Sequence, residues 1–208
     1  MDSTDLAFGR PRPERADAAR NREHLLTVAR EMIAADGVEK LTMDGLAERA
    51  ELGKGTVFRR FGTRAGIFLA LLDDAEHALQ QGVLSGPPPL GPGADPRTRL
   101  IAFGRARIDF LFQHHAVARA TLDRNQPVRA GASTIAGIHI RMLLGQARRD
   151  GLLDITDLDS LAVQLTAALE GPLFLYLATD EASVHGSSPH AALADSWQTL
   201  IERVMPPQ

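Results

Sequence analysis

The 208-residue sequence contains no cysteine, only one tryptophan and one tyrosine, and no long apolar run. Without cysteine, a disulfide framework, a thiolate nucleophile and a cysteine-ligated metal are all excluded. A membrane-spanning helix needs about 20 consecutive apolar residues, and no segment approaches that length. The N-terminus carries Asp2 and Asp5 and lacks the apolar core of a signal peptide. We therefore expect a cytoplasmic protein with no membrane segment.

Motifs of catalysis and metal binding are missing as well. The sequence has no nucleophile elbow, no phosphate-binding glycine loop and no known carboxylate–histidine motif. Seven histidines are present, but the neighbours His114 and His115 would point about 100° apart on a helix, which suits chelation poorly. Positions on the surface or in a pocket explain these histidines better. We expect no catalytic residue, no metal and no other cofactor.

The alternation typical of β-strands is also absent, and helical periodicity runs through most of the chain. Residues 86–93, which read Gly-Pro-Pro-Pro-Leu-Gly-Pro-Gly, cannot be helical and predict a loop. We therefore expect an all-α fold of about nine helices. They are predicted at 20–36, at two short segments within 42–61, and at 64–81, 97–113, 116–122, 127–149, 157–178 and 190–204.

The stretch from Thr42 to Arg64 has the pattern of two short helices joined by a tight turn. Apolar residues at 43, 46, 47 and 50 form one face of the first helix, and Thr42 is a candidate N-cap because its hydroxyl can accept a backbone N–H. Val57 and Phe61 form the apolar side of the second helix. This arrangement is a helix-turn-helix, and its second helix has the length that fits the DNA major groove.

Charge in the same stretch favours DNA binding. Residues 49–64 contain five basic residues and one acid, a local charge of +4, whereas the whole chain has a formal charge of −3. A basic cluster on an otherwise acidic protein can attract DNA phosphates without making the whole molecule bind nucleic acid unspecifically. Charge alone would also fit a solvated helix pair with ordinary surface arginines.

Residues 20–72 resemble the DNA-binding domain of the tetracycline-repressor (TetR/AcrR) family of bacterial transcription regulators. The resemblance rests on Ala-Ala-Asp36-Gly37, Leu41-Thr42-Met43, Leu46-Ala47, Lys54-Gly55-Thr56-Val57-Phe58-Arg59-Arg60-Phe61 and Thr63-Arg64. It implies a homodimer that binds a roughly palindromic DNA operator, and an effector cavity in a larger helical domain. The usual function of the family would be repression relieved by a small molecule.

Three residues depart from the family pattern. Glu51 stands where a turn glycine is usual, and a left-handed backbone there would cost a non-glycine residue about 1 kcal/mol. Phe58 replaces a common tyrosine and lacks the hydroxyl that would reach a phosphate. Arg64 replaces a lysine, which keeps the charge and changes its geometry.

We divide the chain into a mobile basic arm (1–19), a helix-turn-helix DNA-binding domain of three helices (20–64) and a larger helical effector-binding and dimerisation domain (65–208). The arm could touch DNA beside the main site, but a disordered terminus that does not touch DNA explains this segment better. The predicted DNA-binding residues are Thr42, Lys54, Gly55, Thr56, Phe58, Arg59, Arg60 and Arg64. Lys54 and Arg64 are expected to hold phosphates, and Arg59 and Arg60 to reach base edges.

Two further groups of residues are predicted in the larger domain. An effector pocket for an apolar or amphipathic compound is predicted from Phe103, Arg107, Phe110, His114, His139, Met142, Glu170 and Phe174. The same residues could form an ordinary core with polar groups at its edge. A dimer interface is predicted from Leu161, Leu165, Leu169, Leu193, Trp197, Leu200, Ile201 and Val204, which could instead close the core of a monomer.

These residues predict a DNA-binding transcriptional regulator. The main alternative is a helical ligand-binding or structural protein whose helix-turn-helix no longer binds DNA. Enzyme activity has the least support in the sequence.

Overall fold

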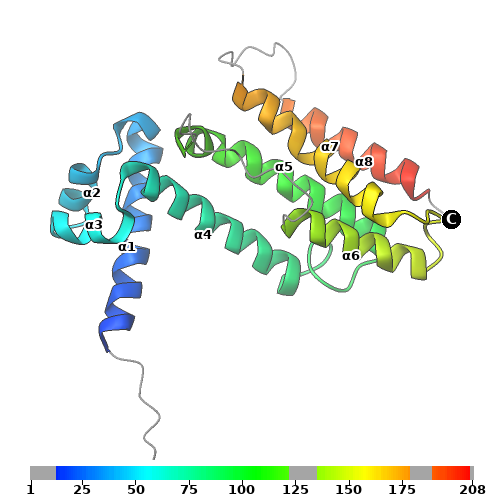
Figure 1. Cartoon of the computed structure of the whole chain (residues 1–208), viewed down its shortest axis with the longest axis horizontal. Helices are drawn as coiled ribbons and strands as arrows, with labels where there is room; N and C mark the ends of the chain where they lie inside the picture. The colour runs from blue at the N-terminus through cyan, green and yellow to red at the C-terminus, as the bar shows by residue number, and fades with distance from the viewer. Residues whose placement is uncertain (1–12, 122–134, 179–188, 207–208) are drawn as a thin grey trace, which may run out of the picture. The chain divides into compact units, whose positions relative to one another are not determined.

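The computed structural model describes residues 13–121, 135–178 and 189–206, which form eight α-helices and one short 3₁₀ helix (Figure 1). No β-strand occurs in these residues, so the all-α prediction is confirmed. None of the helices in the described ranges is long and apolar enough to cross a membrane. The contacts divide the chain into two compact units, Met1–Leu71 and Leu72–Gln208.

The first unit is a small helical domain. It contains α1 (Pro13–Asp36), the 3₁₀ helix η1 (Val38–Lys40), α2 (Met43–Arg49), α3 (Lys54–Phe61) and the first turns of α4 (Arg64–Ser85). Its core is apolar and closely packed, because each helix buries one side. The largest fully buried side chains in it are Leu25, Leu26, Leu41, Leu46, Ile67 and Phe68.

Helix α1 begins seven residues before the predicted start at Arg20. The prediction of a mobile arm is therefore wrong for residues 13–19, whereas residues 1–12 lie outside the described part of the chain. Pro13 suits the first position of a helix because its fixed φ is already helical. The following segment, Glu14 to Arg20, is rich in alanine, arginine and glutamate, which have high helix propensity.

The turn between α2 and α3 has the backbone geometry expected from its sequence position. Glu51 has a φ of 54°, the left-handed conformation predicted for it. The N–H of Glu51 donates to the carbonyl of Glu48 at 3.1 Å, and the N–H of Leu52 donates to the carbonyl of Ala47 at 3.0 Å. These two bonds form a Schellman motif, which satisfies carbonyls at the end of α2. The turn is thus well formed around a strained glutamate.

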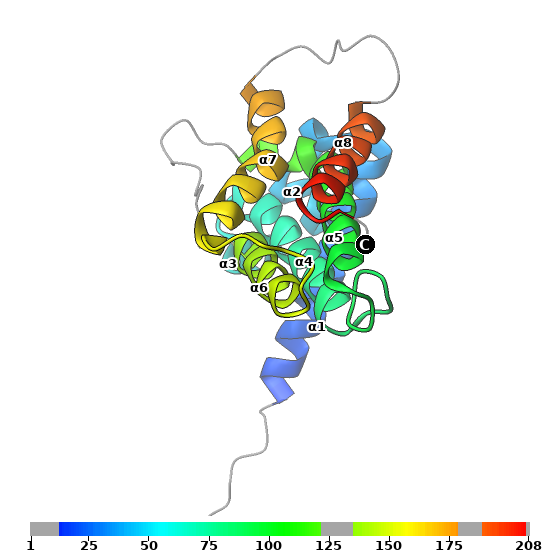
Figure 2. The same ribbon diagram turned by 90° about the vertical axis from the view of Figure 1, so that its right-hand side faces the viewer.

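The second unit is a helical bundle. It contains the rest of α4 together with α5 (Pro96–Thr121), α6 (Ile135–Arg149), α7 (Leu158–Ala178) and α8 (Pro189–Val204). Helix α5 contacts α6, α7 and α8, and α6 also packs against α7. Figure 2 looks roughly along these helices and shows them gathered side by side. The predicted loop lies between α4 and α5.

Helix α5 corrects one sequence prediction. Residues 97–113 and 116–122 were predicted as two helices, but a single helix runs from Pro96 to Thr121. The reason is that residues 105–121 contain neither glycine nor proline, so nothing in the sequence ends the helix near His114. The predicted helix start at Pro127 lies outside the described residues.

Trp197 of α8 is buried against α5. Its side chain is 4% exposed, and its Nε1–H donates to the carbonyl of Leu100 at 3.0 Å. A Cβ atom at Gly104 would lie only 1.9 Å from Nε1 of this ring, so glycine is required there. Trp197 therefore holds α8 to α5 within one chain.

Candidate nucleic-acid interface and small-molecule pocket

Helix α3 turns one side into the core of the first unit and the rest outward. Val57 is fully buried and Phe61 is partly buried, whereas Lys54, Gly55, Arg59 and Arg60 are exposed. Phe58 is also exposed, at 49%, which is unusual for a phenylalanine. The basic residues and this aromatic ring lie on one short helix in the first unit.

The basic side chains of α3 make contacts only at the surface. Lys54 Nζ lies 3.0 Å from a carboxylate oxygen of Asp44, and both side chains are more than 60% exposed. Arg59 Nε donates to the Gly55 carbonyl at 3.2 Å, and Arg60 donates to the carbonyl of Ala18 at 2.9 Å. Exposed pairs of this kind contribute about 0–1 kcal/mol, so a phosphate or a base can replace them at little cost.

Two of the predicted DNA-binding residues have structural partners inside the first unit. Thr42 caps α2, because its Oγ1 accepts from the N–H of Gly45 at 3.0 Å. Arg64 donates to the carbonyls of Leu41 and Val38, each at 2.7 Å. Its guanidinium also lies over the Phe68 ring, 5.0 Å from the centroid. Arg64 thus fixes the segment that precedes α2, a role that the sequence did not reveal.

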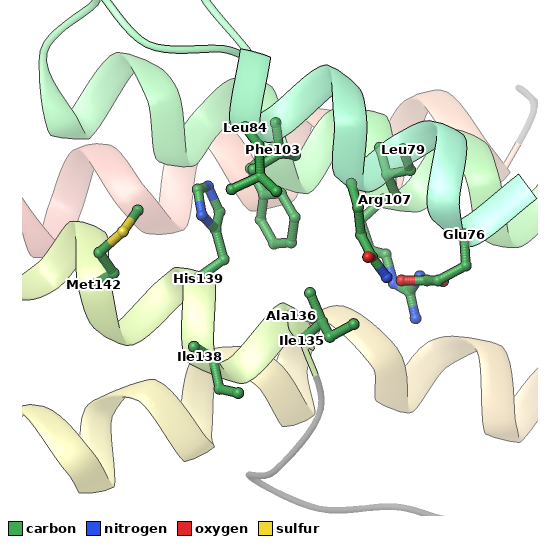
Figure 3. Close-up of a pocket in the computed structure, with 12 residues that line it drawn as sticks. Glu76, Leu79, Leu84, Phe103, Arg107, Ile135, Ala136, Ile138, His139 and Met142 are labelled. Carbon is green, nitrogen blue, oxygen red and sulfur yellow. The ribbon is translucent and has the colours of Figure 1, made fainter. Parts of the chain in front are cut away.

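The second unit contains a cavity of about 160 Å³ with mostly apolar walls between α4, α5 and α6 (Figure 3). Four predicted pocket residues line it, namely Phe103, Arg107, His139 and Met142. The sequence missed eight others: Glu76, Leu79, Gln80, Val83, Leu84, Ile135, Ala136 and Ile138. Most of the missed residues belong to α4, which continues to Ser85 and not to Gln81 as predicted. The spacing of Leu79 and Val83, four residues apart, was the available signal.

The other four predicted pocket residues are not among the lining residues. Phe110 and His114 share a face of α5 with Phe103, but His114 lies about 10 Å farther along the helix axis than Arg107, and its ring packs on Phe110 at 4.8 Å between centroids. Glu170 forms an ion pair with Arg107 but does not line the cavity itself. Phe174 falls on α7, and its side chain lies outside the described residues.

Arg107 is held between two carboxylates at one end of the cavity. Its Nη1 lies 2.6 Å from Glu76 of α4 and its Nη2 lies 3.2 Å from Glu170 of α7. The Arg107 side chain is 12% exposed, and its guanidinium also lies over Phe110, 4.9 Å from the ring centroid. This network joins α5 to both α4 and α7, and Figure 3 shows the pair of Arg107 and Glu76 side by side.

His139 lies at a different part of the wall, on α6. Its ring packs against Phe103 with 4.8 Å between centroids. Burial, and then the positive charge of Arg99, lower the pKa of His139 from 6.5 to about 4. The imidazole is therefore neutral at physiological pH. Among the described residues, no group of histidines and carboxylates has the arrangement of a metal site.

Residues 25–71 match the family described as "Bacterial regulatory proteins, tetR family". This DNA-binding domain belongs to the TetR family. This match covers the helix-turn-helix and the start of α4, so the sequence resemblance is confirmed in the region that carried it. TetR-family proteins are DNA-binding transcriptional regulators and not enzymes.

Solved structures of TetR-family regulators share the fold over nearly the whole chain. A regulator from Pectobacterium atrosepticum has a TM-score of 0.71 at 18% identity, covering 95% of this chain and 99% of its own. RolR in complex with resorcinol has a TM-score of 0.57 at 19% identity, covering 93% and 91%. AibR in complex with isovaleryl coenzyme A and operator DNA has a TM-score of 0.54 at 17% identity, covering 90% and 100%. No curated protein sequence gives a significant match.

Proposed function

We propose that this TetR-family protein is a homodimeric repressor that binds a palindromic operator and is released by a small effector in the second unit. The observation that carries the proposal is the presence of two sites in one chain. An exposed basic recognition helix lies in the first unit, and an apolar cavity with a few polar groups lies in the second.

The proposed DNA surface centres on α3 as the recognition helix. Lys54 and Thr56 at its start would hold phosphates, and Arg59 and Arg60 would reach base edges, because a guanidinium pairs bidentately with guanine. A Cβ atom at Gly55 would meet no atom within 4 Å, so packing does not require glycine there. Its small size would instead let a phosphate approach the backbone. Arg64 is removed from this surface because its donors are used inside the unit.

The proposed dimer interface also differs from the predicted set. Leu165, Leu169, Trp197 and Ile201 are buried within a single chain, each at 4% exposure or less, so they cannot supply the contact. The exposed edge of α7 and α8 is a better candidate. There, a groove is lined by Ala168, Leu193, Ser196 and Leu200 together with the buried residues Ile108, Leu169 and Trp197. The small residues Ala168 and Ser196 would allow a partner helix to approach closely.

Helix α4 supports the proposed coupling between effector and DNA. It begins at Arg64 in the first unit, and five of the twelve residues that line the cavity lie on it. A ligand in the cavity would therefore contact α4 directly, and it would also lie beside the Glu76–Arg107 ion pair. Its effect on DNA affinity can be no larger than its difference in affinity for the two conformations.

The solved neighbours support a ligand-responsive function but differ in their ligands. RolR was crystallised with resorcinol, a single ring, and AibR with isovaleryl coenzyme A, a large anionic thioester. A cavity of about 160 Å³ is closer to the first in size, since an engineered cavity of about 150 Å³ in another protein holds benzene.

The DNA part of the proposal is tested by a gel-shift titration against the DNA upstream of the protein's own gene at several salt concentrations. Lys54→Ala should weaken all sequences alike and lower the salt slope by about one unit. Arg60→Ala should weaken the operator more than unrelated DNA. The matched control is Arg149→Ala, which removes an exposed arginine of the second unit and should change nothing. Unchanged affinity and salt slope in both α3 variants would reject the DNA surface.

The dimer part is tested by sedimentation at micromolar concentration. Leu200 is 36% exposed. Leu200→Glu should give a folded monomer, because a carboxylate buried in the interface without a partner costs several kcal/mol. Leu69→Glu is the matched control, since Leu69 is 55% exposed on α4, and it should remain a dimer. A wild-type monomer would refute the interface.

A further inference from the structure

Two of the described residues that line the cavity each have a buried side-chain nitrogen with no hydrogen-bond partner, Arg107 and His139, and the second has no other hydrogen bond or ion pair described for its side chain. His139 is 6% exposed, and its Nε2 atom is fully buried and unpaired. Figure 3 shows the ring projecting from α6 toward Phe103, across the lining of the cavity. A buried unpaired nitrogen is unfavourable, and a ligand atom that hydrogen-bonds to it removes that penalty.

Among the described residues that line the cavity, Arg107 is the only one with a cationic side chain, and its charge is already neutralised. Arg107 pairs with both Glu76 and Glu170, at 2.6 and 3.2 Å, so the three groups together carry a charge of −1. An anionic ligand would have to displace a carboxylate or remain beside one. Arg107 Nε is also buried without a partner, but as a single N–H it can serve an uncharged oxygen as readily as a charged one.

His139 does not add a positive charge. Burial and the nearby charge of Arg99 lower its pKa to about 4, so the imidazole is neutral at pH 7. A neutral ring nitrogen accepts or donates one hydrogen bond according to its tautomer. It therefore recognises a hydroxyl or another uncharged polar group.

The rest of the wall sets the size and polarity of the ligand. The remaining lining side chains are aliphatic or aromatic except Gln80 and Glu76. The cavity volume is about 160 Å³. A cavity of about 150 Å³ in another protein holds benzene, so this one has room for one ring or one short branched chain. A coenzyme A moiety is far too large for it.

We infer that the cavity binds a small uncharged compound, with one ring or short branched chain as its body and one hydroxyl or similar group that hydrogen-bonds to Nε2 of His139. Carboxylates of the same size are disfavoured, because Glu76 and Glu170 already pair with Arg107 and would repel a third carboxylate there. This inference rests on the proposed function, because it specifies the chemical class of the effector at that site.

The test compares three probes of matched size on the full-length protein at pH 7.5: phenol, toluene and benzoate. Binding is measured by calorimetry and by the rise in melting temperature, both without DNA. Phenol should bind at least about tenfold more tightly than toluene, and benzoate should bind more weakly than either. Tighter binding of benzoate than phenol, or no binding of any probe at millimolar concentration, would overturn the inference.

Two variants measure the contribution of the His139 side chain to phenol binding. His139→Phe keeps a ring in the wall and removes both nitrogens, so phenol should lose about tenfold in affinity while toluene keeps its own. His77→Phe makes the same substitution at an exposed histidine of α4 that does not line the cavity, and it should leave the affinity for phenol and for toluene unchanged. Equal affinity of phenol for the wild type and His139→Phe would also overturn the inference.

A separate gel shift keeps this inference distinct from the proposed function. Phenol that binds through His139 without weakening DNA binding would refute the effector role and leave the ligand class standing. Release from DNA by benzoate alone would do the opposite, because the regulatory role would stand and the ligand class would fail.

Discussion

Arg59 and Arg60 in the first unit are exposed on α3, whereas Arg99 and Arg107 in the second unit lie almost entirely inside the bundle. Each of the two exposed arginines donates a hydrogen bond to a backbone carbonyl, which a nucleic acid can replace. The buried pair is engaged with a carbonyl or with carboxylates of the same chain. The comparison shows that position, and not residue type, decides whether an arginine serves an outside partner.

Arg64 shows that an arginine of the first unit can also have an internal role. It lies in the first unit next to α3, but its donors bind the carbonyls of Leu41 and Val38. Its family position suggested a phosphate contact, and the structure gives it an internal one. The first unit therefore also uses one arginine for its own stability, at the start of α4.

If the second unit depends on interior packing, its buried tryptophan should matter most. Trp197→Ala should lower the free energy of unfolding by about 3–5 kcal/mol, because it leaves a large cavity and removes the hydrogen bond from the indole to the Leu100 carbonyl. Urea unfolding followed by circular dichroism measures this. Val163→Ala, at a position 47% exposed on α7, should cost less than about 1 kcal/mol. Equal losses in the two variants would contradict the packing of α8 on α5.

If burial controls the charges of the second unit, stability should respond to pH through His139. The pKa of its imidazole is 6.5 when unfolded and about 4 when folded, so the unfolded state binds the proton first. The contribution is therefore intact above pH 6.5 and lost as the pH falls from 6.5 to 4, by about 3 kcal/mol in total.

This pH effect is measured as a difference between variants. Urea unfolding at pH 7.5 and at pH 4.5 should show a smaller loss for His139→Gln than for the wild type. His115→Gln changes an exposed histidine of α5 and should follow the wild type. A wild-type slope retained in His139→Gln would show that other groups cause the acid sensitivity.

If the first unit keeps strain in its turn, removing that strain should stabilise it. Glu51→Gly should raise the free energy of unfolding by about 1 kcal/mol, because glycine adopts the φ of 54° without a steric penalty. Glu48→Gly, two positions before the turn region within α2, should instead lower it by about 0.5–1 kcal/mol. Thermal unfolding distinguishes the two, and a lower melting temperature for Glu51→Gly would be inconsistent with strain at this residue.

If the basic side chains of α3 are available to DNA, removing an acid that pairs with one of them should raise DNA affinity by a small, measurable amount. Asp44 lies 3.0 Å from Lys54, so Asp44→Asn should raise operator affinity about twofold and change stability by less than about 0.5 kcal/mol. Fluorescence anisotropy at 0.1 M salt measures the affinity. Asp150→Asn, an exposed acid of the second unit, serves as the control, and an equal gain there would point to net charge alone.

The two units also differ in how far the sequence predicted them. In the first unit, the cap at Thr42 and the buried Val57 follow from neighbours within a few residues, so local pattern was sufficient for them. The left-handed Glu51 followed from the resemblance to the family. In the second unit, Phe103 and His139 were placed correctly in the cavity wall, but the contribution of α4 was missed. That contribution depends on helices far apart in the sequence packing together, which periodicity does not encode.

The sequence did not reveal that Trp197, a predicted interface residue, is buried within one chain, and the reason is related. A wide apolar stripe on α8 is consistent with an interface or with a core, and periodicity cannot distinguish them. Trp197 belongs to the core because Gly104 leaves space for its ring, a pairing of residues 93 positions apart. Of the predicted interface residues of α8, Leu193, Trp197 and Leu200 line the groove, and of these three Trp197 is the one counted in the core, at 4% exposure.

The division between the two units falls inside α4, after Leu71, and this has a consequence for recombination. A chain cut at Leu71 would end in a helix of only two turns, and one extended to Ser85 would carry the apolar side chains of Leu79 and Val83 into water. Neither fragment is a self-contained module. A hybrid regulator with a new sensing domain must therefore be joined within a continuous helix, and the apolar face of that helix must match the new domain.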